Sequence, residues 1–432
     1  MVFRYPTFAP DILKHTTMFG RKTTKLDNAA LIYTSSLSDN YANKFRVSVT
    51  LAKDVDRDSL NDALAITIKR FPSFRYKLGR GLFWCHFTSI KQAPKVSDSC
   101  ELDPLPIKDS SGYLFKITCD GPTVNMDVFH SLADGTAAMT FLMTLAAEYL
   151  RLHDGVEVNS NNWILDTAEE ASEEECSDAF ESFSSGKGEL EKGTPAYHVH
   201  GSEVSDEVLH NMKVTIPTSM LKEEARKNHC TVTDLLTAIM IRSIQRIRKE
   251  DRSRSKRSSI KVCVPVNLRK IYKKNTMRNF SSYVNLGVDV GTSDKDLSDI
   301  VKCVSTQKKM LTDPKCLEPK INANVSLEKN PFIRMIPWNI KKIAMQIIHR
   351  LKGDRLCSQT LSNLGQIELP DSMKRHVKGI NFQLGKHLYN FGACGCVSYG
   401  GITTLNFSRK IRETKFEQYF LEELRSLGIR TA

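Results

Sequence analysis

The sequence predicts an α/β fold, and three observations indicate it. Residues 124–150 change from a two-residue alternation of apolar and polar side chains to apolar side chains at helical spacing, with a sharp turn between them. Segments with these two patterns recur through both halves of the chain. The 432 residues, 41% hydrophobic and 26% charged, suffice for two globular domains with large cores. We therefore expect sheets covered by helices.

The first half contains the strand–turn–helix unit at 124–150 and a similar alternation before it. A helix that begins at Asp58 or Ser59 should end at Pro72, because proline cannot continue a helix. Two of the strands expected in this half lie at 45–51 and at 114–118. A third should follow a turn at 79–81 and end in the letters GLFW.

The second half follows an acidic, Ser/Gly-rich stretch at 166–194, whose composition predicts a mobile linker. We expect an N-terminal domain at 1–180 and a C-terminal domain at 181–432. The elements predicted after the linker are strands at 212–216, 260–266 and 358–365, helices from Pro217, after Thr231 or Thr233, at 296–311 and at 414–427, and a hairpin at 394–408 turned at Gly400 and Gly401.

Residues 333–351 form a basic amphipathic pattern that permits two interpretations. Such a helix can lie on a membrane surface. More often it packs on a sheet of its own protein, and we favour this second interpretation. The basic run at 252–259 predicts a solvated loop.

The net charge and the absence of several sequence motifs exclude some classes of function. The net charge of +13 suits a polyanion or a phosphate-rich cofactor, although scattered surface lysines explain most of it. Zinc-finger and RNA-binding signatures, the P-loop, GxGxxG, HExxH and GxSxG are absent from the sequence, which disfavours nucleic-acid binding, nucleotide hydrolysis, Rossmann redox chemistry, zinc peptidases and serine hydrolases.

The cysteines and the N-terminal sequence predict a cytoplasmic protein. The eleven cysteines are scattered, the first residues lack the apolar core of a signal peptide, and no apolar run reaches the ~20 residues of a membrane span. Cys394 and Cys396 lie in a Gly-rich apolar run without metal-ligand partners at useful spacing, so we expect them in the core and expect no metal.

His130 stands where the 124–128 strand ends, in the letters HSLADG. A rigid strand can aim such a side chain while the following loop leaves it accessible. Imidazole titrates near neutral pH, so His130 is a candidate general base. Asp134 can hold the turn or accept a hydrogen bond from an arginine, and Gly135 suits a sharply bent backbone. The same residues also fit a strand–turn–helix with no catalytic role.

The letters HSLADG, with PVNLR at 265–269, RNFSSYVN at 278–285 and SNLG at 362–365 in the same order, resemble the CoA-dependent acyltransferase superfamily. Its members include chloramphenicol acetyltransferase, plant BAHD acyltransferases, alcohol acetyltransferases and condensation domains of peptide synthetases. The similarity is greatest to the alcohol acetyltransferases and extends from about Leu26 to Gly428. It implies two chloramphenicol-acetyltransferase-like lobes, each a mixed β-sheet with helices, with an active-site tunnel between them.

The resemblance also implies roles for individual residues. Arg269 should pair with Asp134, and the Asp134–Gly135 turn should be structural. Ser362 and Asn363 become candidates to hold an oxyanion or the acceptor, although a polar strand end is an equally good explanation of both. Residues 381–385 occupy the place of a structural motif of the BAHD enzymes, but only Phe382 and Gly385 match it.

The function implied is transfer of an acetyl or other acyl group from acyl-CoA to the hydroxyl of an alcohol, with His130 as general base and no permanently bound cofactor. One alternative is a condensation-type enzyme that uses a carrier-protein thioester and an amine or hydroxyl acceptor. Condensation domains usually carry two adjacent histidines, and Phe129 replaces the first one here. A second alternative is a non-catalytic binding protein with the same fold.

Overall fold

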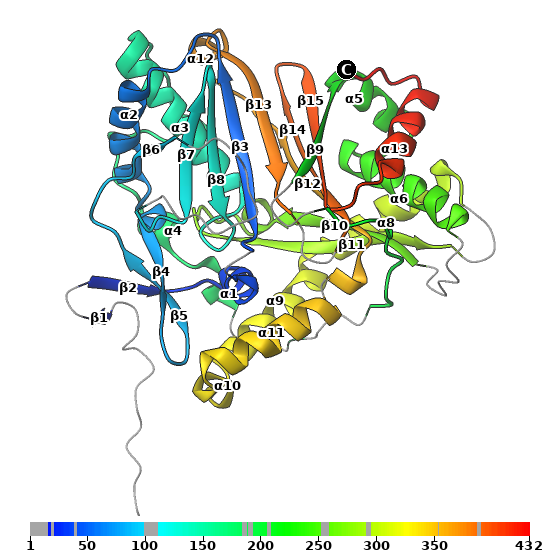
Figure 1. Cartoon of the computed structure of the whole chain (residues 1–432), viewed down its shortest axis with the longest axis horizontal. Coiled ribbons are helices and arrows are strands. Elements are labelled where there is room, and N and C mark those ends of the chain that lie inside the picture. Colours follow the sequence, from blue (N-terminus) through cyan, green and yellow to red (C-terminus); the bar gives the residue numbers. More distant parts are fainter. Residues whose placement is uncertain are drawn as a thin grey trace, which may run out of the picture.

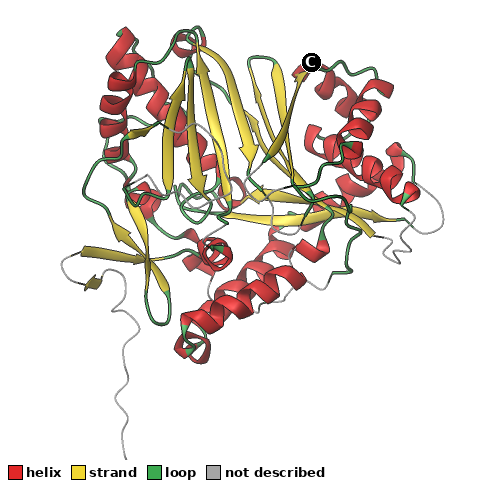
Figure 2. Cartoon of the chain, viewed as in Figure 1, coloured by secondary structure: helices red, strands yellow, loops and turns green. Residues whose placement is uncertain are grey.

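Two α/β lobes stand side by side in the computed structural model (Figure 1; Figure 2). It describes residues 16–18, 21–38, 41–98, 111–183, 188, 193–204, 209–251, 259–290, 295–352, 354–386 and 390–432. The predicted basic loop at 252–258 lies outside these residues. Both large sheets contain parallel and antiparallel neighbours, as the mixed α/β prediction requires.

The N-terminal lobe is a five-stranded sheet with helices on one face. Its strand order is β13-β3-β8-β7-β6. Val124, Met126 and Val128 of β8 point into the core, where α3 packs on the sheet beside α2. The elements are β3 (Lys44–Leu51), β6 (Val96–Ser97), β7 (Phe115–Asp120), β8 (Thr123–Phe129), β13 (Val377–Leu384), α2 (Arg57–Arg70) and α3 (Gly135–Asp154).

The C-terminal lobe is a six-stranded sheet in the order β11-β10-β12-β14-β15-β9. Helices α6, α8 and α13 cover it on the right of Figure 1. Thr231 and Asp234 cap α6 reciprocally, which satisfies two backbone N–H groups at its start. The elements are β9 (His210–Pro217), β10 (Ser259–Asn267), β11 (Ser281–Asp289), β12 (Gln359–Gln366), β14 (Gly392–Tyr399), β15 (Ile402–Arg409), α5 (Thr218–Lys227), α6 (Val232–Glu250), α7 (Leu268–Tyr272), α8 (Leu297–Leu311) and α13 (Lys415–Ser426). The short helix α12 (Asp371–Lys374) lies with the N-terminal lobe, where Met373 is part of the core.

Strand β13 joins the two lobes. It pairs antiparallel with β3 in the N-terminal sheet, although it follows β12 of the C-terminal sheet in sequence. A side chain at Gly395 of β14 would collide with the carbonyl oxygen of Phe382 in β13, so glycine allows the sheets to approach here. The domain boundary at residue 180 stays a prediction, because the chain returns to the N-terminal sheet well after it.

A smaller sheet and a group of helices extend below the two lobes (Figure 1). The letters GLFW form the turn of a hairpin, closed by a hydrogen bond from Gly81 N–H to Trp84 O, so the prediction of a strand there is wrong. The elements are β1 (Thr16–Met18), β2 (Arg21–Lys25), β4 (Tyr76–Arg80), β5 (Cys85–Ser89), α1 (Asn28–Ser36), α9 (Pro314–Lys329), α10 (Pro331–Met335) and α11 (Trp338–Lys352), with 3-10 turns at Pro72–Phe74 and Asp354–Leu356.

The amphipathic segment at 333–351 is divided between α10 and α11, and Trp338 at the start of α11 packs with Cys85 and Phe87 of β5. Helix α11 packs on α1 and leaves Ile340, Ile343 and Ile347 exposed. The favoured interpretation, a helix packed on its own sheet, is therefore confirmed for the inner face of α11 and wrong for its isoleucine face.

The acidic stretch is ordered where the structure describes it. Glu175 of α4 (Glu173–Cys176) is buried and accepts two hydrogen bonds from Arg70, at 2.9 and 3.0 Å. Phe180, in a 3-10 turn at Ala179–Phe183, packs against Phe280. The mobile linker predicted from composition is wrong for residues 166–183, because a buried ion pair and an aromatic contact fix them.

Two further expectations concern the core and the membrane. Cys394 and Cys396 are buried in β14, as predicted, and burial raises the pKa of Cys396 to about 12. Within the described ranges, no helix has both the length and the apolar character needed to cross a membrane.

Candidate active site

His130 follows directly on the end of β8, beside the start of β3. Its backbone N–H donates to Asn43 O at 2.9 Å, which fixes the chain at the strand end. The imidazole is half-buried and lies between two aromatic rings. Tyr33 of α1 stacks on it with centroids 4.0 Å apart and planes at 16°, and Phe45 of β3 meets it edge-on at 5.0 Å. The sequence supplied His130, but the contact with Tyr33, 97 positions away, was not predicted.

Asp134 is the N-cap of α3 and uses both carboxylate oxygens. Oδ1 accepts the N–H of Ala137 at 3.1 Å, and Oδ2 accepts the N–H of Phe280 at 3.0 Å. Arg269 Nη1 donates to Oδ2 at 2.7 Å, so the predicted contact between Arg269 and Asp134 is present. The carboxylate therefore ties the turn after His130 to the second lobe.

Arg269 extends this connection into its own lobe. Its Nε donates to Thr276 O at 2.7 Å and its Nη2 to Arg278 O at 2.6 Å. Burial alone would raise the pKa of Asp134, but the charge of Arg269 and the hydrogen bonds to the carboxylate lower it below its ordinary value. The lowered pKa makes Asp134 a weaker base than an ordinary aspartate, which suits a structural role.

Two asparagines make further ties between the lobes. Asn267, at the end of β10, donates to Thr136 Oγ1 at 3.1 Å. Asn279 is buried and donates to Ser131 O at 3.1 Å. Both stand in sequence segments that carried the family resemblance, in PVNLR and RNF, but neither had been assigned a role.

Gly135 lies in a crowded place, and its backbone does not need the left-handed bend that favours glycine. It is the first residue of α3, and its backbone is outside the left-handed region. A Cβ atom there would lie 2.9 Å from Leu364 Cδ2 and 3.4 Å from Phe382. The expected reason for glycine is therefore wrong, and what crowds this position is the close approach of β12 and β13.

A second buried acid, Asp27, lies near the same turn. It caps α1 through Ala30 N–H at 2.8 Å and stands 3.5 Å from Arg278 Nη2. Burial raises the pKa of Asp27 to about 7; Arg278 opposes this shift, and the nearby charges of Asp178 and Asp134 add to it. This acid therefore holds its proton well above the pH at which an exposed aspartate would lose it.

Ser362 and Asn363 of β12 point to opposite faces of the sheet. Asn363 Nδ2 donates to Thr233 Oγ1 of α6 at 3.1 Å, on the side that α6 and α8 cover. Ser362 pairs with Gly395 of β14, and the open side of Gly395 faces Phe382 of β13, so Ser362 lies on the face toward the N-terminal lobe. The structure does not bring these two polar side chains together.

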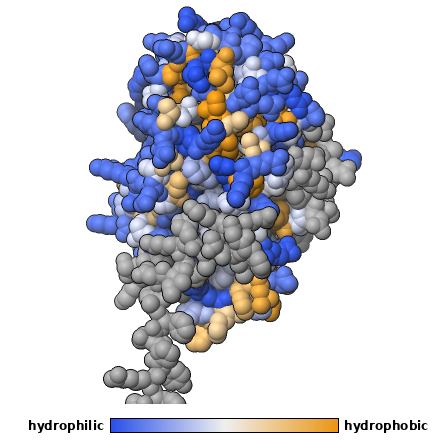
Figure 3. All heavy atoms as spheres, turned by 90° about the vertical axis from the view of Figure 1, so that its left-hand side faces the viewer, coloured by the Kyte–Doolittle hydropathy of each residue, from blue (hydrophilic) through white to orange (hydrophobic). Residues whose placement is uncertain are grey.

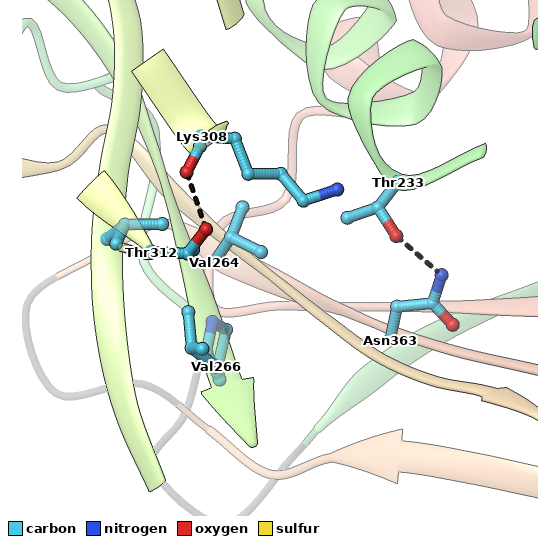
Figure 4. Close-up of a pocket in the computed structure, with 8 residues that line it drawn as sticks. Thr233, Val264, Val266, Lys308, Thr312 and Asn363 are labelled. Atoms are coloured by element: carbon cyan, nitrogen blue, oxygen red, sulfur yellow. Dashed lines mark hydrogen bonds between the residues drawn. The ribbon is translucent and has the colours of Figure 1, made fainter. Parts of the chain in front are cut away.

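Asn363 lines a pocket of about 130 Å³ between β10, β12, α6 and α8 (Figure 4). The remaining lining is mostly apolar, and Lys308 closes one side. The lysine Nζ is held at 2.8 Å by both Thr231 Oγ1 and Asp234 Oδ1. The pocket therefore offers an apolar wall with one amide.

Comparison with known proteins identifies a family and a fold for this chain. The profile of the alcohol acetyltransferase family matches residues 182–415, just over half of the chain. The match contains Arg269 and Ser362 but begins after His130. No curated protein matches the sequence significantly.

Solved structures share the fold at low sequence identity. They include polyketide synthase associated protein 5 from Mycobacterium tuberculosis (14% identity, TM-score 0.63, 93% of this chain and 96% of that one). TRI101 of F. graminearum, complexed with coenzyme A and T-2 mycotoxin, is 11% identical (TM-score 0.62, 95% and 99%). The first condensation domain of the calcium-dependent antibiotic synthetase is 13% identical (TM-score 0.58, 94% and 95%). The chain therefore has the two-lobed fold of these proteins and belongs to the alcohol acetyltransferase family, which makes it an acyltransferase.

Proposed function

We propose that this protein transfers an acetyl or other short acyl group from acyl-CoA to the hydroxyl of an alcohol, with His130 as general base. The observation that carries the proposal is the half-buried imidazole of His130 at the end of β8, oriented by Tyr33 and Phe45. The turn behind it is fixed by the Asp134–Arg269 pair. A base held in this way can act without rearrangement.

The reaction follows from these parts. His130 takes the proton of the acceptor hydroxyl as its oxygen attacks the thioester carbonyl carbon. The carbonyl electrons move to oxygen to form a tetrahedral oxyanion. They return as the C–S bond breaks, and the protonated imidazole gives its proton to the departing CoA thiolate. General base catalysis contributes about 10²- to 10⁴-fold.

Ser362 is the better of the two oxyanion candidates. It lies on the face of β12 toward the N-terminal lobe, which carries His130, and one oxyanion donor is worth about 10²- to 10³-fold. Asn363 has a different role in this proposal. Its pocket would receive an apolar part of one substrate, with the amide oriented by Thr233.

The donor we propose is free acyl-CoA. The sequence has a single histidine in the motif, with the buried Phe129 before it. The fold is shared with TRI101, which was crystallised with coenzyme A, and this is compatible with an acyl-CoA donor. Condensation domains share the fold as well, so a second candidate function is transfer from a carrier-protein thioester to an amine or hydroxyl. The compartment we propose is the cytoplasm, where buried thiols such as Cys85 and Cys394 stay reduced.

A donor and acceptor panel tests the proposal. The full chain is incubated with acetyl-CoA or longer acyl-CoA and with short alcohols, long alcohols or amines, and free thiol release is measured. Alcohol-dependent thiol release with a short acyl-CoA is the expected result. Turnover only with a carrier-bound thioester would favour the condensation candidate, and no turnover with either donor would favour a binding protein.

A further inference from the structure

Most of the exposed large apolar side chains in the described part of the chain lie in one region. Of the thirteen large apolar side chains that are exposed in the described part of the chain, nine lie on the α10–α11 segment and the tip of the β4–β5 hairpin. These residues form what we name the lower patch. Figure 1 places its elements at the lower end of the molecule, and Figure 3 shows apolar atoms gathered at that end. Its most exposed members include Leu82, Phe332, Met335, Ile340, Ile343 and Ile347.

The hairpin tip and the helices form a continuous surface because they are bonded together. The backbone N–H of Trp338, at the start of α11, donates to Leu82 O at 2.8 Å. Lys341 Nζ donates to Phe83 O at 2.9 Å and lies 3.5 Å from the centre of the Trp84 ring. The exposed Leu82 and Phe83 are therefore held beside the exposed face of α11.

A helix on a water-facing surface normally exposes its polar side chains, whereas α11 exposes a row of isoleucines. Trp338, Lys341 and Met345 recur at spacings of three and four and face the protein. Ile340, Ile343 and Ile347 recur at the same spacings on the outer face, between 53% and 60% exposed. Burial lowers the pKa of Lys341 to about 8, with Arg334 as the second cause. Two further side chains fix this orientation, since Lys342 donates to Leu37 O and Gln346 to Ser35 O.

The charge of residues 331–352 distinguishes between a second copy of the chain and a lipid surface as the binding partner of the lower patch. Residues 331–352 contain five lysines and arginines and no aspartate or glutamate. A symmetric dimer through the lower patch would bring two segments of the same positive charge together. An anionic lipid surface instead offers an apolar layer for the isoleucines and negative headgroups for the exposed Arg334 at the start of this segment.

We propose that the lower patch binds the surface of an anionic lipid bilayer, with α11 lying in the headgroup region and the Leu82–Phe83 tip inserted beside it. The interaction is peripheral, since α11 has only 15 residues and a membrane span needs ~20. It does not depend on the proposed acyl transfer.

Vesicle flotation of the full chain tests the proposal. Phosphatidylcholine vesicles with and without phosphatidylserine are compared at low and high salt. The wild-type chain should float with the anionic vesicles, and added salt should weaken binding. The triple variant Ile340→Gln, Ile343→Gln, Ile347→Gln should bind roughly tenfold or more weakly, because three inserted apolar side chains are lost.

A matched control replaces three exposed apolar side chains outside the lower patch, as Leu152→Gln, Met310→Gln, Ile402→Gln, and should bind like the wild type. Both triple variants should melt like the wild type, since the altered side chains are exposed. No flotation of the wild type, equal binding to neutral vesicles, or equal loss in both triple variants would overturn the proposal. So would a wild-type dimer in light scattering that only the α11 triple variant dissociates, since a second copy would then occupy the patch.

Discussion

Removing the carboxylate of Asp134 should loosen the turn that carries His130. In Asp134→Ala, the guanidinium of Arg269 stays in a site where its side chain is only 10% exposed. Leaving one partner of a buried pair uncompensated costs about 3–5 kcal/mol. Part of this cost, about 1 kcal/mol, is the lost N-cap of α3.

Asp134→Asn separates the two contributions. An asparagine can still cap α3, so this variant should recover about 1 kcal/mol while the arginine remains unpaired. For a chain of 432 residues, each kcal/mol corresponds to roughly 1 °C in melting temperature. Asp134→Ala should therefore melt about 3–5 °C lower than the wild type and lose activity as well.

The double variant tests the pairing itself. Thermal melting and thiol release are measured for Asp134→Ala, Arg269→Ala and the two combined. The double variant should be little worse than the worse single variant, because both changes remove one shared interaction. Asp371→Ala, which breaks an exposed pair with Lys374, is the control and should not change melting. Losses that add in the double variant would refute the reasoning.

Two further predictions concern the strand β12 and the buried acid near the turn. Ser362→Ala should lower kcat by about 10²- to 10³-fold with little change in KM. Asn363→Ala should change mainly the KM of one substrate. The reverse pattern would assign the stabilisation of the oxyanion to Asn363. Asp27 keeps its proton in the folded state up to about pH 7, while an unfolded aspartate loses it near 3.8. The folded state then binds more protons between these values, so the stability from this group falls as pH rises from about 4 to 7. Asp27→Asn should make the urea midpoint less sensitive to pH in that window, and an unchanged pH profile would contradict the raised pKa.

Local patterns predicted the elements that carry the site. The alternation of Val124, Met126 and Val128 predicted β8 and its buried face, because period-two burial is a property of the strand itself. Proline and glycine signals placed the end of α2 and the turn at Gly400 and Gly401, both of which have positive φ. The contact of Arg269 with Asp134, 135 positions apart, came only from the family resemblance.

The features that were missed depend on distant partners. The composition of the acidic stretch suggested a mobile segment, but Glu175 is fixed by Arg70, 105 positions away. The stacking of Tyr33 on His130 joins α1 to β8 and leaves no signal in either local sequence. The pattern of 333–351 identified an apolar face, but periodicity alone does not say whether that face meets the protein or the outside.

The role of His130 as general base is tested by thiol release from His130→Ala, with His376→Ala as its matched control. Both histidines are half-buried, and they lie at opposite ends of the N-terminal sheet, since β3 pairs with Phe129 at one end and with Val377 at the other. The account predicts that His130→Ala melts like the wild type and loses about 10²-fold or more of acyl transfer, while His376→Ala keeps its activity. Thiol release by His130→Ala within about tenfold of the wild type would contradict the assignment of His130 as the general base.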